Sequence, residues 1–318
     1  MTGLRVLVTG ARGFIGAATV RHLEGAGFAV RAGMRAPVAG DAAVLCDLDR
    51  PETLSAALAG IDCVVHTAYG DVGRMAQQCE ALLDAMRGAG VPALVYLSSI
   101  AVYGALEGEV DETVPLPPPI DAYAAAKIDC EAKVAAFTAT GGSAIVLRPG
   151  IVYGRGSHYW IDKLCERIRL GAWGTYGPAG EGIAALIHVD DLAAMIGEAV
   201  SMLTKTPAPL SGPLATFNAV GPETPGWNAY FTALAAAMGA SPLPTIDSAT
   251  LGRRQMMGLA AKLWRKAGLP GGAAAALVPQ PAEMALFSRK ARYAMGAAAT
   301  LLGFRPTIGL AEGLRRSL

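Results

Sequence analysis

The sequence predicts an α/β fold, in which helices cover both faces of a doubly wound parallel sheet and a smaller lobe is interleaved in the C-terminal half. Short apolar runs alternate with Ala- and Leu-rich runs of helical length, and the first apolar run leads directly into a glycine cluster. A length of 318 residues allows one large domain or a domain with a lobe. We expect the sheet core over residues 1–154 and the lobe over 155–318, with segments near 183–200 and 215–221 returning to the core.

The predicted strands are short and apolar, which is typical of a parallel sheet buried on both faces. They are Leu4–Thr9, Phe28–Met34, Ala43–Cys46, Cys63–Thr67, Leu94–Ser98 and Ala144–Leu147. The helices expected between several of them are Ala17–Gly25, Glu52–Ala59 and Met75–Arg87. The third helix is expected to end at the glycines of 88–90, because glycine tolerates the left-handed conformation of a helix C-terminus. After residue 154 the alternation weakens, and Gly and Pro gather near 171–182, 206–213 and 221–226.

Composition and charge exclude several classes of protein. No apolar run reaches the ~18 to 20 residues of a membrane span, and no signal-peptide pattern precedes the first strand. A net charge of +1 predicts no attraction to nucleic acid. The five cysteines are scattered without a CxxC spacing, which favours reduced thiols over a structural zinc site. We therefore expect a cytoplasmic protein with no metal, no nucleic-acid partner and no membrane span, for which a homodimer is one allowed assembly.

Three glycines with the spacing GxxGxxG follow the first strand. They are Gly10, Gly13 and Gly16. In a doubly wound fold this turn leads into a helix N-terminus, whose backbone N–H groups and positive dipole bind a pyrophosphate. A side chain at Gly10 or Gly13 is expected to hold the phosphates off, whereas Gly16 is expected to let the helix pack on the strand. The turn therefore predicts a dinucleotide site.

Ser99, Tyr123 and Lys127 form the predicted catalytic trio. Tyr123 and Lys127 lie four residues apart, hence on one helix face. Lowering a tyrosine pKa from ~10 to about 7 takes about 4 kcal/mol, which one cation ~4 Å away supplies at an effective dielectric of ~20. Tyr123 is thus the expected acid/base and Lys127 the group that lowers its pKa and binds a ribose, while Ser99 is expected to bind the substrate oxygen. The alternative is a core tyrosine, a surface lysine and a serine at a strand end.

With these motifs the chain resembles an extended short-chain dehydrogenase/reductase of the NAD-dependent epimerase/dehydratase family. The resemblance extends to the stretches 46–48, 62–68, 147–154, 187–193 and 302–306, but not to about 242–286. It implies a Rossmann core and hydride transfer to or from a nicotinamide. The cofactor-binding residues expected from the glycine turn and from the resemblance are Gly10, Arg12, Gly13, Phe14, Ile15, Gly16, Arg35, Asp47, Leu48, Ala68, Tyr123, Lys127 and Pro149.

The choice of cofactor depends on the end of the second strand. A carboxylate there would bind a 2′-hydroxyl, but this strand ends at Met34-Arg35 without an acid. Arg35 and Arg12 could both reach a 2′-phosphate, which suits a guanidinium fork. The sequence therefore favours NADP over NAD. The alternative is that Arg35 stacks on the adenine and Arg12 is solvated.

Several family features are missing. Ile100 and Ala101 follow Ser99 in place of the Asp-Glu pair of the dehydratases. Ile151 and Ala184 stand where relatives that bind nucleotide-diphospho sugars carry pyrophosphate ligands, and a diphosphate without donors binds poorly. We expect an oxidoreductase that acts on a carbonyl or secondary alcohol of a small organic substrate. The alternatives are a nucleotide-sugar epimerase and a non-catalytic NADP-binding sensor.

Aromatic residues after the 147–154 motif are candidates for the substrate pocket. They are Tyr153, His158, Tyr159 and Trp160, although aromatic residues are equally common in protein cores.

Residues 253–266 contain five cations and no acid, with apolar residues at helical spacing. This basic amphipathic helix has three interpretations: a solvated helix of the lobe, a lid that attracts an anionic group, and a contact with a membrane surface.

Overall fold

The computed structural model describes residues 3–37, 43–205, 212–266 and 278–318. Its central sheet has seven strands in the order β10-β7-β5-β4-β1-β2-β3, and every pair is parallel. The strands are β1 (Arg5–Thr9), β2 (Ala29–Met34), β3 (Ala43–Leu45), β4 (Cys63–His66), β5 (Ala93–Leu97), β7 (Ser143–Pro149) and β10 (Leu214–Ala219). The direction of winding reverses between β1 and β4, which confirms the predicted doubly wound α/β fold.

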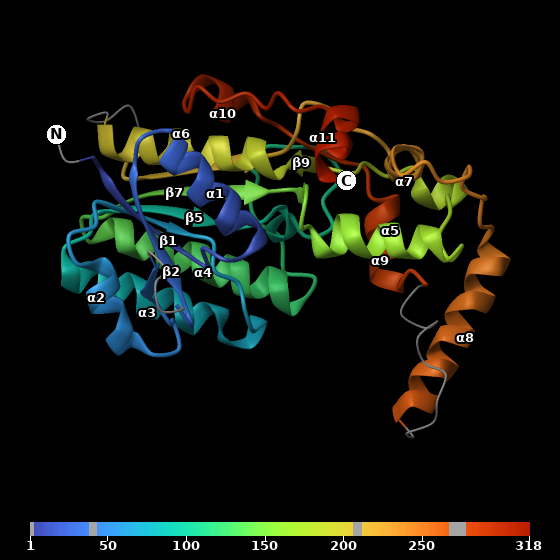
Figure 1. The fold of residues 1–318 in the computed structure, drawn as a ribbon, viewed down its shortest axis with the longest axis horizontal. Coiled ribbons are helices and arrows are strands. Elements are labelled where there is room, and N and C mark those ends of the chain that lie inside the picture. Colours follow the sequence, from blue (N-terminus) through green and yellow to red (C-terminus); the bar gives the residue numbers. More distant parts are fainter. Residues whose placement is uncertain (1–2, 38–42, 206–211, 267–277) are drawn as a thin grey trace.

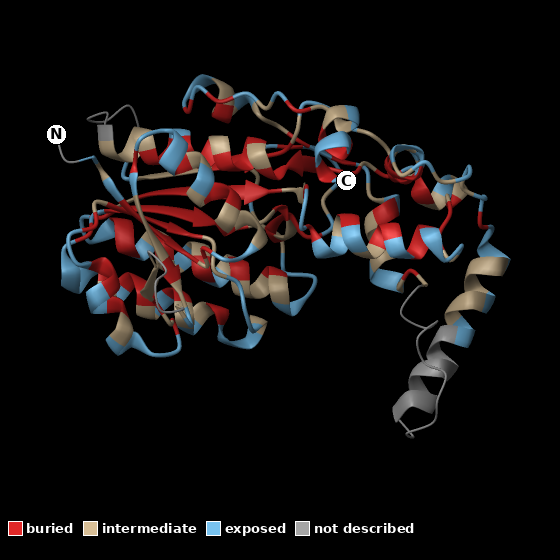
Figure 2. Cartoon of the chain, viewed as in Figure 1, coloured by how far each residue is buried: buried red, intermediate tan, exposed pale blue. Residues whose placement is uncertain are grey.

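Helices cover both faces of this sheet (Figure 1). On one face lie α1 (Phe14–Gly25), α6 (Val189–Lys205) and α10 (Gly296–Thr300), and on the other lie α2 (Leu54–Leu58), α3 (Met75–Ala89) and α4 (Ala122–Ala139). The strands between them are buried, as Figure 2 shows. On β1, Val6 and Val8 join the core beneath α1 and α6, whereas Leu7 joins the core beneath α3. As predicted, α3 ends at a glycine in the left-handed conformation, Gly90, with φ +67°.

The lobe packs around a cluster of aromatic rings. Its helices are α5 (Lys163–Arg169), α7 (Trp227–Ala237), α8 (Ser248–Lys266), α9 (Pro281–Ser288) and α11 (Leu310–Ser317). Trp173, Tyr176, Trp227, Phe231 and Phe287 form the centre of the cluster. Short helical turns connect the elements: η1 (Pro51–Thr53), η2 (Val72–Arg74), η3 (Ile100–Tyr103), η4 (His158–Asp162) and η5 (Gly177–Gly180).

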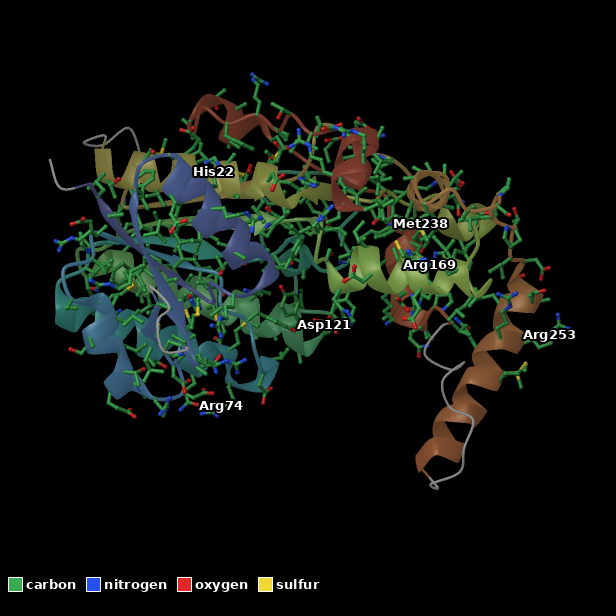
Figure 3. All side chains as sticks on the ribbon, viewed as in Figure 1. His22, Arg74, Asp121, Arg169, Met238 and Arg253 are labelled. Carbon is green, nitrogen blue, oxygen red and sulfur yellow. The ribbon has the colours of Figure 1, made fainter. Side chains whose placement is uncertain are left out.

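Two small parallel pairs lie where the core meets the lobe. β6 (Gly108–Val110) pairs with β11 (Ala291–Tyr293), and β8 (Ile151–Tyr153) pairs with β9 (Leu186–His188). Helix α8 extends away from the rest of the lobe, and Figure 3 labels Arg253 on its outer side. The side chains of the predicted cations Lys262, Arg265 and Lys266 lie outside the described residues.

Segments from the C-terminal half complete the core. β10 pairs with β7 from Leu214 opposite Ala144 to Ala219 opposite Pro149. α6 packs on α1 so closely that a Cβ at Gly197 would lie 2.7 Å from Nε2 of His22, which Figure 3 labels. Ala298, Leu302 and Phe304 also belong to the core, although the predicted division did not include residues 298–304 among the returning segments.

The glycine turn is shaped by close packing of the backbone. Gly10 has φ +69°, and a Cβ there would lie 2.7 Å from Cα of Ala68, the residue that follows β4 and Thr67. A Cβ at Gly16 would overlap the carbonyl oxygen of Gly10, and one at Gly13 would lie 3.1 Å from the same oxygen. Gly10 thus lets β1 and the residues after β4 come together, and Gly16 lets α1 pack on the turn as predicted, while the effect of Gly10 on phosphate binding stays a prediction.

Gly16→Ala should destabilise the protein, because the added methyl meets backbone atoms that have no room to move. Overpacking of this kind typically costs about 1–3 kcal/mol in the free energy of unfolding. Gly25→Ala, in the last turn of the same helix, is the matched control, since a Cβ there meets no atom within 4 Å. Urea unfolding of both variants measures the difference. Equal midpoints for the two variants would contradict the packing argument.

Candidate active site

The predicted site residues gather at the carboxyl ends of the central strands. The glycine turn follows β1, Ala68 follows β4, Ser99 follows β5 and Pro149 ends β7. Figure 3 labels Asp121 at the start of α4, on the side of the core that faces the lobe. Asp121 caps the helix, since its Oδ1 accepts a hydrogen bond of 2.7 Å from the backbone N–H of Ala124. This edge is where doubly wound sheets bind ligands.

Ser99 lies close to Tyr123, since it is one of the groups that shift the pKa of Tyr123. Ser99 Oγ accepts a hydrogen bond of 3.1 Å from the backbone N–H of Ala101 and so caps η3. Burial raises the pKa of Tyr123, a hydrogen bond with Ser99 acts in the opposite direction, and Tyr69 and Asp121 raise the pKa further. The phenol of Tyr123 therefore stays protonated at neutral pH.

Lys127 is buried beside this pair, and its ammonium is bound to a backbone carbonyl. Its Nζ donates a hydrogen bond of 2.6 Å to the carbonyl of Leu97 and lies 3.4 Å from Oη of Tyr96. It lies 5.9 Å from the centre of the Tyr123 ring. The pKa of Tyr123 is raised, chiefly by burial, rather than lowered, and the ribose-binding role of Lys127 stays a prediction. Burial lowers the pKa of Lys127 itself to about 8.

A buried ion pair that sequence reasoning missed anchors α4. Arg148 donates to both carboxylate oxygens of Glu131, at 3.0 and 2.6 Å, and to Oη of Tyr103 at 2.9 Å. Tyr103 in turn donates to Oδ1 of Asn218 at 2.7 Å. The four residues join α4, β7, η3 and β10. The sequence did contain one sign that Glu131 belongs to the site. Glu131 follows Lys127 by four residues and therefore lies on the same helix face as Tyr123 and Lys127.

The start of α1 is suited to a phosphate. Gly13 is the residue before the helix and provides no side-chain cap, and the first turn, which begins with Phe14 and Ile15, contains no acid. The first N–H groups of a helix have no intrahelical partner, so these groups are available to an anion. Gly156 approaches from the lobe side, since a Cβ there would lie 3.8 Å from Cδ2 of Phe14. These residues fit the pyrophosphate of a dinucleotide.

Two arginines lie near the end of β2. Arg12 Nη1 donates to the carbonyl of Ala36 at 3.4 Å, and Arg35 is exposed directly after the strand. Arg35 also helps to lower the pKa of Asp47, although the hydrogen bond from Arg50 is the larger cause. The Asp47 carboxylate accepts from Nε of Arg50 at 2.8 Å and from the backbone N–H of Asp49 at 3.1 Å. These hydrogen bonds of Asp47 stabilise the loop after β3. Leu48 in the same loop is buried in the core.

The predicted substrate residues lie in different environments. Tyr153 is 2% exposed and packs edge-on against the rings of His188 and Tyr230, so it belongs to the core of the lobe. His158 and Tyr159 are exposed on η4. Trp160 packs on Trp227 with 5.3 Å between ring centres. Tyr153 is thus buried among the aromatic rings of the lobe, and substrate contact at all four residues stays a prediction.

A small apolar void of about 10 Å³ lies where η3 and β8 meet the lobe. Its lining residues are Ile100, Ile151, Ile183, Ala185, Trp227, Leu286, Arg289, Ala291 and Tyr293. Tyr69, which is 63% exposed, packs edge-on against Tyr123 with 5.8 Å between ring centres. Neither Ser99 nor Tyr123 lines the void, whereas the ring of Tyr123 has an exposed aromatic neighbour in Tyr69.

The two histidines near the site have structural roles. His66 shares a hydrogen bond of 2.7 Å between its Nδ1 and Oγ1 of Thr9, and burial lowers its pKa to about 3, so it is neutral. His188 accepts a hydrogen bond of 3.2 Å from the backbone N–H of Asp190.

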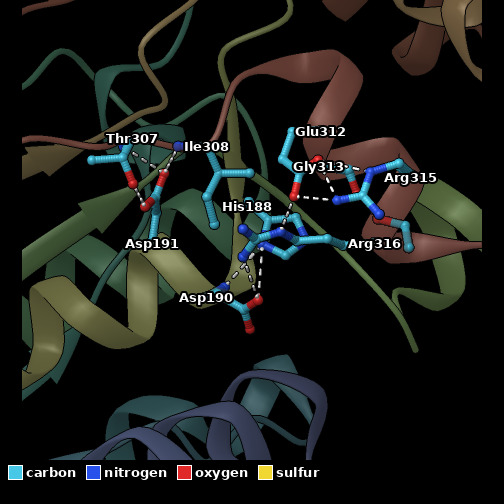
Figure 4. Close-up of polar contacts among 10 residues, drawn as sticks. His188, Asp190, Asp191, Thr307, Ile308, Glu312, Gly313, Arg315 and Arg316 are labelled. Atoms are coloured by element: carbon cyan, nitrogen blue, oxygen red, sulfur yellow. Dashed lines mark hydrogen bonds and ion pairs between the residues drawn. The ribbon is translucent and has the colours of Figure 1, made fainter.

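The start of α6 is tied to the C-terminal segment (Figure 4). Asp191 accepts from the N–H groups of Thr307 and Ile308, at 3.0 and 2.9 Å, and Arg316 of α11 lies 3.6 Å from Asp190. Within the described ranges, no three His, Cys, Asp or Glu side chains gather as metal ligands. The helices of these ranges are also too short or too polar to cross a bilayer.

Comparison with known proteins agrees with this geometry. A sequence profile described as "NAD dependent epimerase/dehydratase family" matches residues 6–209, and the chain belongs to this family. A 2-alkyl-3-oxoalkanoate reductase of Stenotrophomonas maltophilia is 31% identical over 187 residues, which are 53% of this chain and 57% of the relative. A 4-hydroxy-2-methyl-3-oxo-4-farnesyl-3,4-dihydroquinoline-1-oxide ketoreductase of Stigmatella aurantiaca is 30% identical over 52% of this chain and 55% of the relative. The match to these two relatives thus spans little more than half of their length.

Solved structures share the whole fold. A UDP-glucose 4-epimerase of Thermotoga maritima with UDP-glucose superimposes with a TM-score of 0.75 at 21% identity, over 99% of this chain and 97% of the other. A human epimerase family protein with NADPH has a TM-score of 0.71 at 22% identity over 98% of both chains. MoeE5, in complex with UDP-glucuronic acid and NAD, has a TM-score of 0.71 at 26% identity over 98% and 97%.

Proposed function

We propose that the protein is an NADP-dependent oxidoreductase that reduces the carbonyl group of a small organic substrate. The observation that carries the proposal is a protonated Tyr123 with Ser99 beside it, at the same edge of the sheet as the glycine turn. Family membership supports a nicotinamide cofactor, and the two relatives above bear the names of reductases. The pair Arg12 and Arg35 near the end of β2 supports NADP over NAD.

In the proposed reaction the carbonyl oxygen binds between the hydroxyls of Ser99 and Tyr123. The reduced nicotinamide, when bound, supplies a hydride to the carbonyl carbon. Ser99 orients the oxygen by a hydrogen bond, and Tyr123 donates its proton to that oxygen as negative charge develops. A raised pKa suits Tyr123 to this acid role, since the phenol is protonated before the reaction. Lys127 holds the spacing of the pair, contributes a positive charge near the resulting phenolate, and is a proposed ligand of the ribose.

Tyr123→Phe should remove most of the turnover and leave cofactor affinity nearly unchanged, because it deletes only the proton donor. General acids typically contribute ~10² to 10⁴-fold in rate. Steady-state kinetics on a panel of ketones, together with fluorescence titration of NADPH, measures both effects. If Tyr123→Phe kept the wild-type rate, Tyr123 would not be the proton donor. A wild-type protein that binds NADPH but reduces no carbonyl compound would instead favour the alternative of a non-catalytic NADP-binding sensor.

The rate of reduction should fall as the pH rises through about 8. The positive charge of Lys127 is complete below its lowered pKa of about 8 and is lost above it. The ammonium lies 5.9 Å from the centre of the Tyr123 ring and is bound to the Leu97 carbonyl, so the loss should be about 10-fold or less in kcat/KM. Lys127→Arg should shift the fall to higher pH, since a guanidinium keeps its charge. A pH profile that is flat to pH 10, or the same in the two proteins, contradicts this role.

Arg35→Ala should weaken the binding of NADPH and leave that of NADH nearly unchanged, because only NADPH carries the 2′-phosphate. A charge-assisted hydrogen bond is typically worth about 1.5–3 kcal/mol, or about 10- to 150-fold in affinity. Arg21→Ala is the matched control, because it removes the same charge from an exposed position on α1. Titration of both cofactors decides the matter, and tighter binding of NADH by the wild type would overturn the NADP proposal.

UDP- and GDP-sugars should bind the cofactor-loaded protein more weakly than micromolar, which corresponds to about −8 kcal/mol. Ile151 lines the small void and Ala184 is fully buried, so neither supplies a donor to a diphosphate. Isothermal calorimetry measures the binding, with NADPH as the control ligand for a folded site. Micromolar affinity for a nucleotide sugar would make the epimerase alternative the better answer.

A further inference from the structure

Two large apolar side chains are exposed beside the elements that carry Ser99 and Tyr123. Tyr69, in the loop after β4, is 63% exposed, and Ile120, just before α4, is 52% exposed. A single exposed apolar residue is ordinary on a protein surface. The information therefore lies in where these two side chains stand relative to the reactive hydroxyls.

Tyr69 is in contact with the proposed proton donor. Its ring lies edge-on to the ring of Tyr123, with 5.8 Å between the ring centres and an angle of 79° between the ring planes. Burial is the main cause that raises the pKa of Tyr123, and the phenol of Tyr69 raises it further. Tyr69 thus presents an exposed aromatic surface at the border of the group that meets the carbonyl oxygen.

The loop that carries Tyr69 is fixed on both sides of it. On the N-terminal side, the hydroxyl of Thr67 donates to the carbonyl of Thr9 at the end of β1, at 2.7 Å. On the C-terminal side, Asp71 accepts a hydrogen bond of 2.9 Å from the N–H of Gly73 and so caps η2. The backbone at Tyr69 is therefore held in place before a ligand binds, which limits the ordering cost of binding.

Ile120 joins the two elements that carry the reactive hydroxyls. It precedes Asp121, the N-terminal cap of α4, and so lies three residues before Tyr123. A Cβ at Gly104 would lie 3.4 Å from Cγ2 of Ile120, and Gly104 ends the helical turn η3 that Ser99 caps. The exposed aliphatic side chain therefore stands where η3 and the start of α4 meet.

We infer that Tyr69 determines the substrate specificity of the enzyme by pairing with an aromatic ring attached to the carbonyl group that Ser99 and Tyr123 bind. Aromatic rings pair edge-to-face or offset at centre distances of about 4.5–7 Å, and such a pair is favourable beyond the area that it buries. The exposed part of the Tyr69 ring can form this pair while its contact with Tyr123 is kept. The inference rests on the proposed reduction for the identity of the reacting group, but the ring contact can be tested without turnover.

The test compares acetophenone with cyclohexyl methyl ketone, which has a similar size and no aromatic ring. The ratio of their kcat/KM values is compared between variants, because the ratio cancels the difference in intrinsic reactivity. Tyr69→Leu keeps an apolar side chain without a ring, so it should lower the ratio by about 2- to 10-fold, mainly through KM of acetophenone. Tyr69→Phe keeps the ring and should leave the ratio unchanged. Leu301→Ala is the control, because Leu301 is 55% exposed but directly follows α10.

A second measurement separates the ring contact from the reaction. Saturation-transfer NMR of acetophenone, on protein loaded with oxidised NADP, reports binding without a hydride donor. Binding that is lost in Tyr69→Leu and kept in Tyr69→Phe, in a protein that reduces no ketone, would support the ring contact and overturn the proposed function. An unchanged ratio in Tyr69→Leu, a lowered ratio in Tyr69→Phe, or acetophenone binding that does not depend on Tyr69 would each overturn the inference. Titration of NADPH and urea unfolding confirm that each variant is folded and binds the cofactor.

Discussion

The hydrogen bond from the buried ammonium of Lys127 to the carbonyl of Leu97 is the contact on which the site depends. It ties α4 to the end of β5 at a distance of 2.6 Å. Leu97 precedes Ser99 by two residues and Lys127 follows Tyr123 by one helical turn, so the same contact sets the position of Tyr123 relative to Ser99. A buried ammonium is costly to keep charged, and the lowered pKa of Lys127 expresses that cost.

A second buried cation extends this arrangement toward the lobe. Arg148 holds Glu131 of α4 and Tyr103 of η3, and Tyr103 packs against Tyr293 with 5.6 Å between ring centres. Tyr293 and Arg289 line the same small void, and Arg289 opposes the effect of burial, which raises the pKa of Tyr293. A continuous set of packed side chains therefore connects the helix of the reactive tyrosine with the lobe.

The sequence predicted the central sheet well because buried parallel strands leave a strong local signal. β1, β2 and β4 begin or end within one residue of the predicted bounds. α1 begins at Phe14 rather than at residue 17, so its first turn includes Phe14 and Ile15. The predicted helix 52–59 divides into η1 and the short α2. The three-residue strands β6, β8, β9 and β11 were not predicted, since each pairs with a distant segment and is too short to show a period.

The candidate site was predictable where spacing along one helix or one turn defines it. Tyr123 and Lys127 share a helix face in any α-helix, and the glycines of the turn are adjacent in the sequence. The partners of Lys127 were not predictable, because its main acceptor is a backbone carbonyl that any residue at position 97 would provide. Tyr69 lies far from Tyr123 in the sequence, and only the fold brings the centres of their rings to 5.8 Å. Long-range proximity of this kind leaves no local pattern.

A crystal structure of the protein with NADP and a bound carbonyl substrate or a non-reducible analogue tests the central claim most directly. The account predicts that the reacting oxygen lies within hydrogen-bonding distance, about 2.6–3.2 Å, of both Oγ of Ser99 and Oη of Tyr123. It also predicts that Lys127 of α4 still donates its hydrogen bond to the carbonyl of Leu97 at the end of β5. A ligand whose reacting oxygen lies away from Ser99 and Tyr123, or a cofactor bound elsewhere than at the glycine turn, would contradict it.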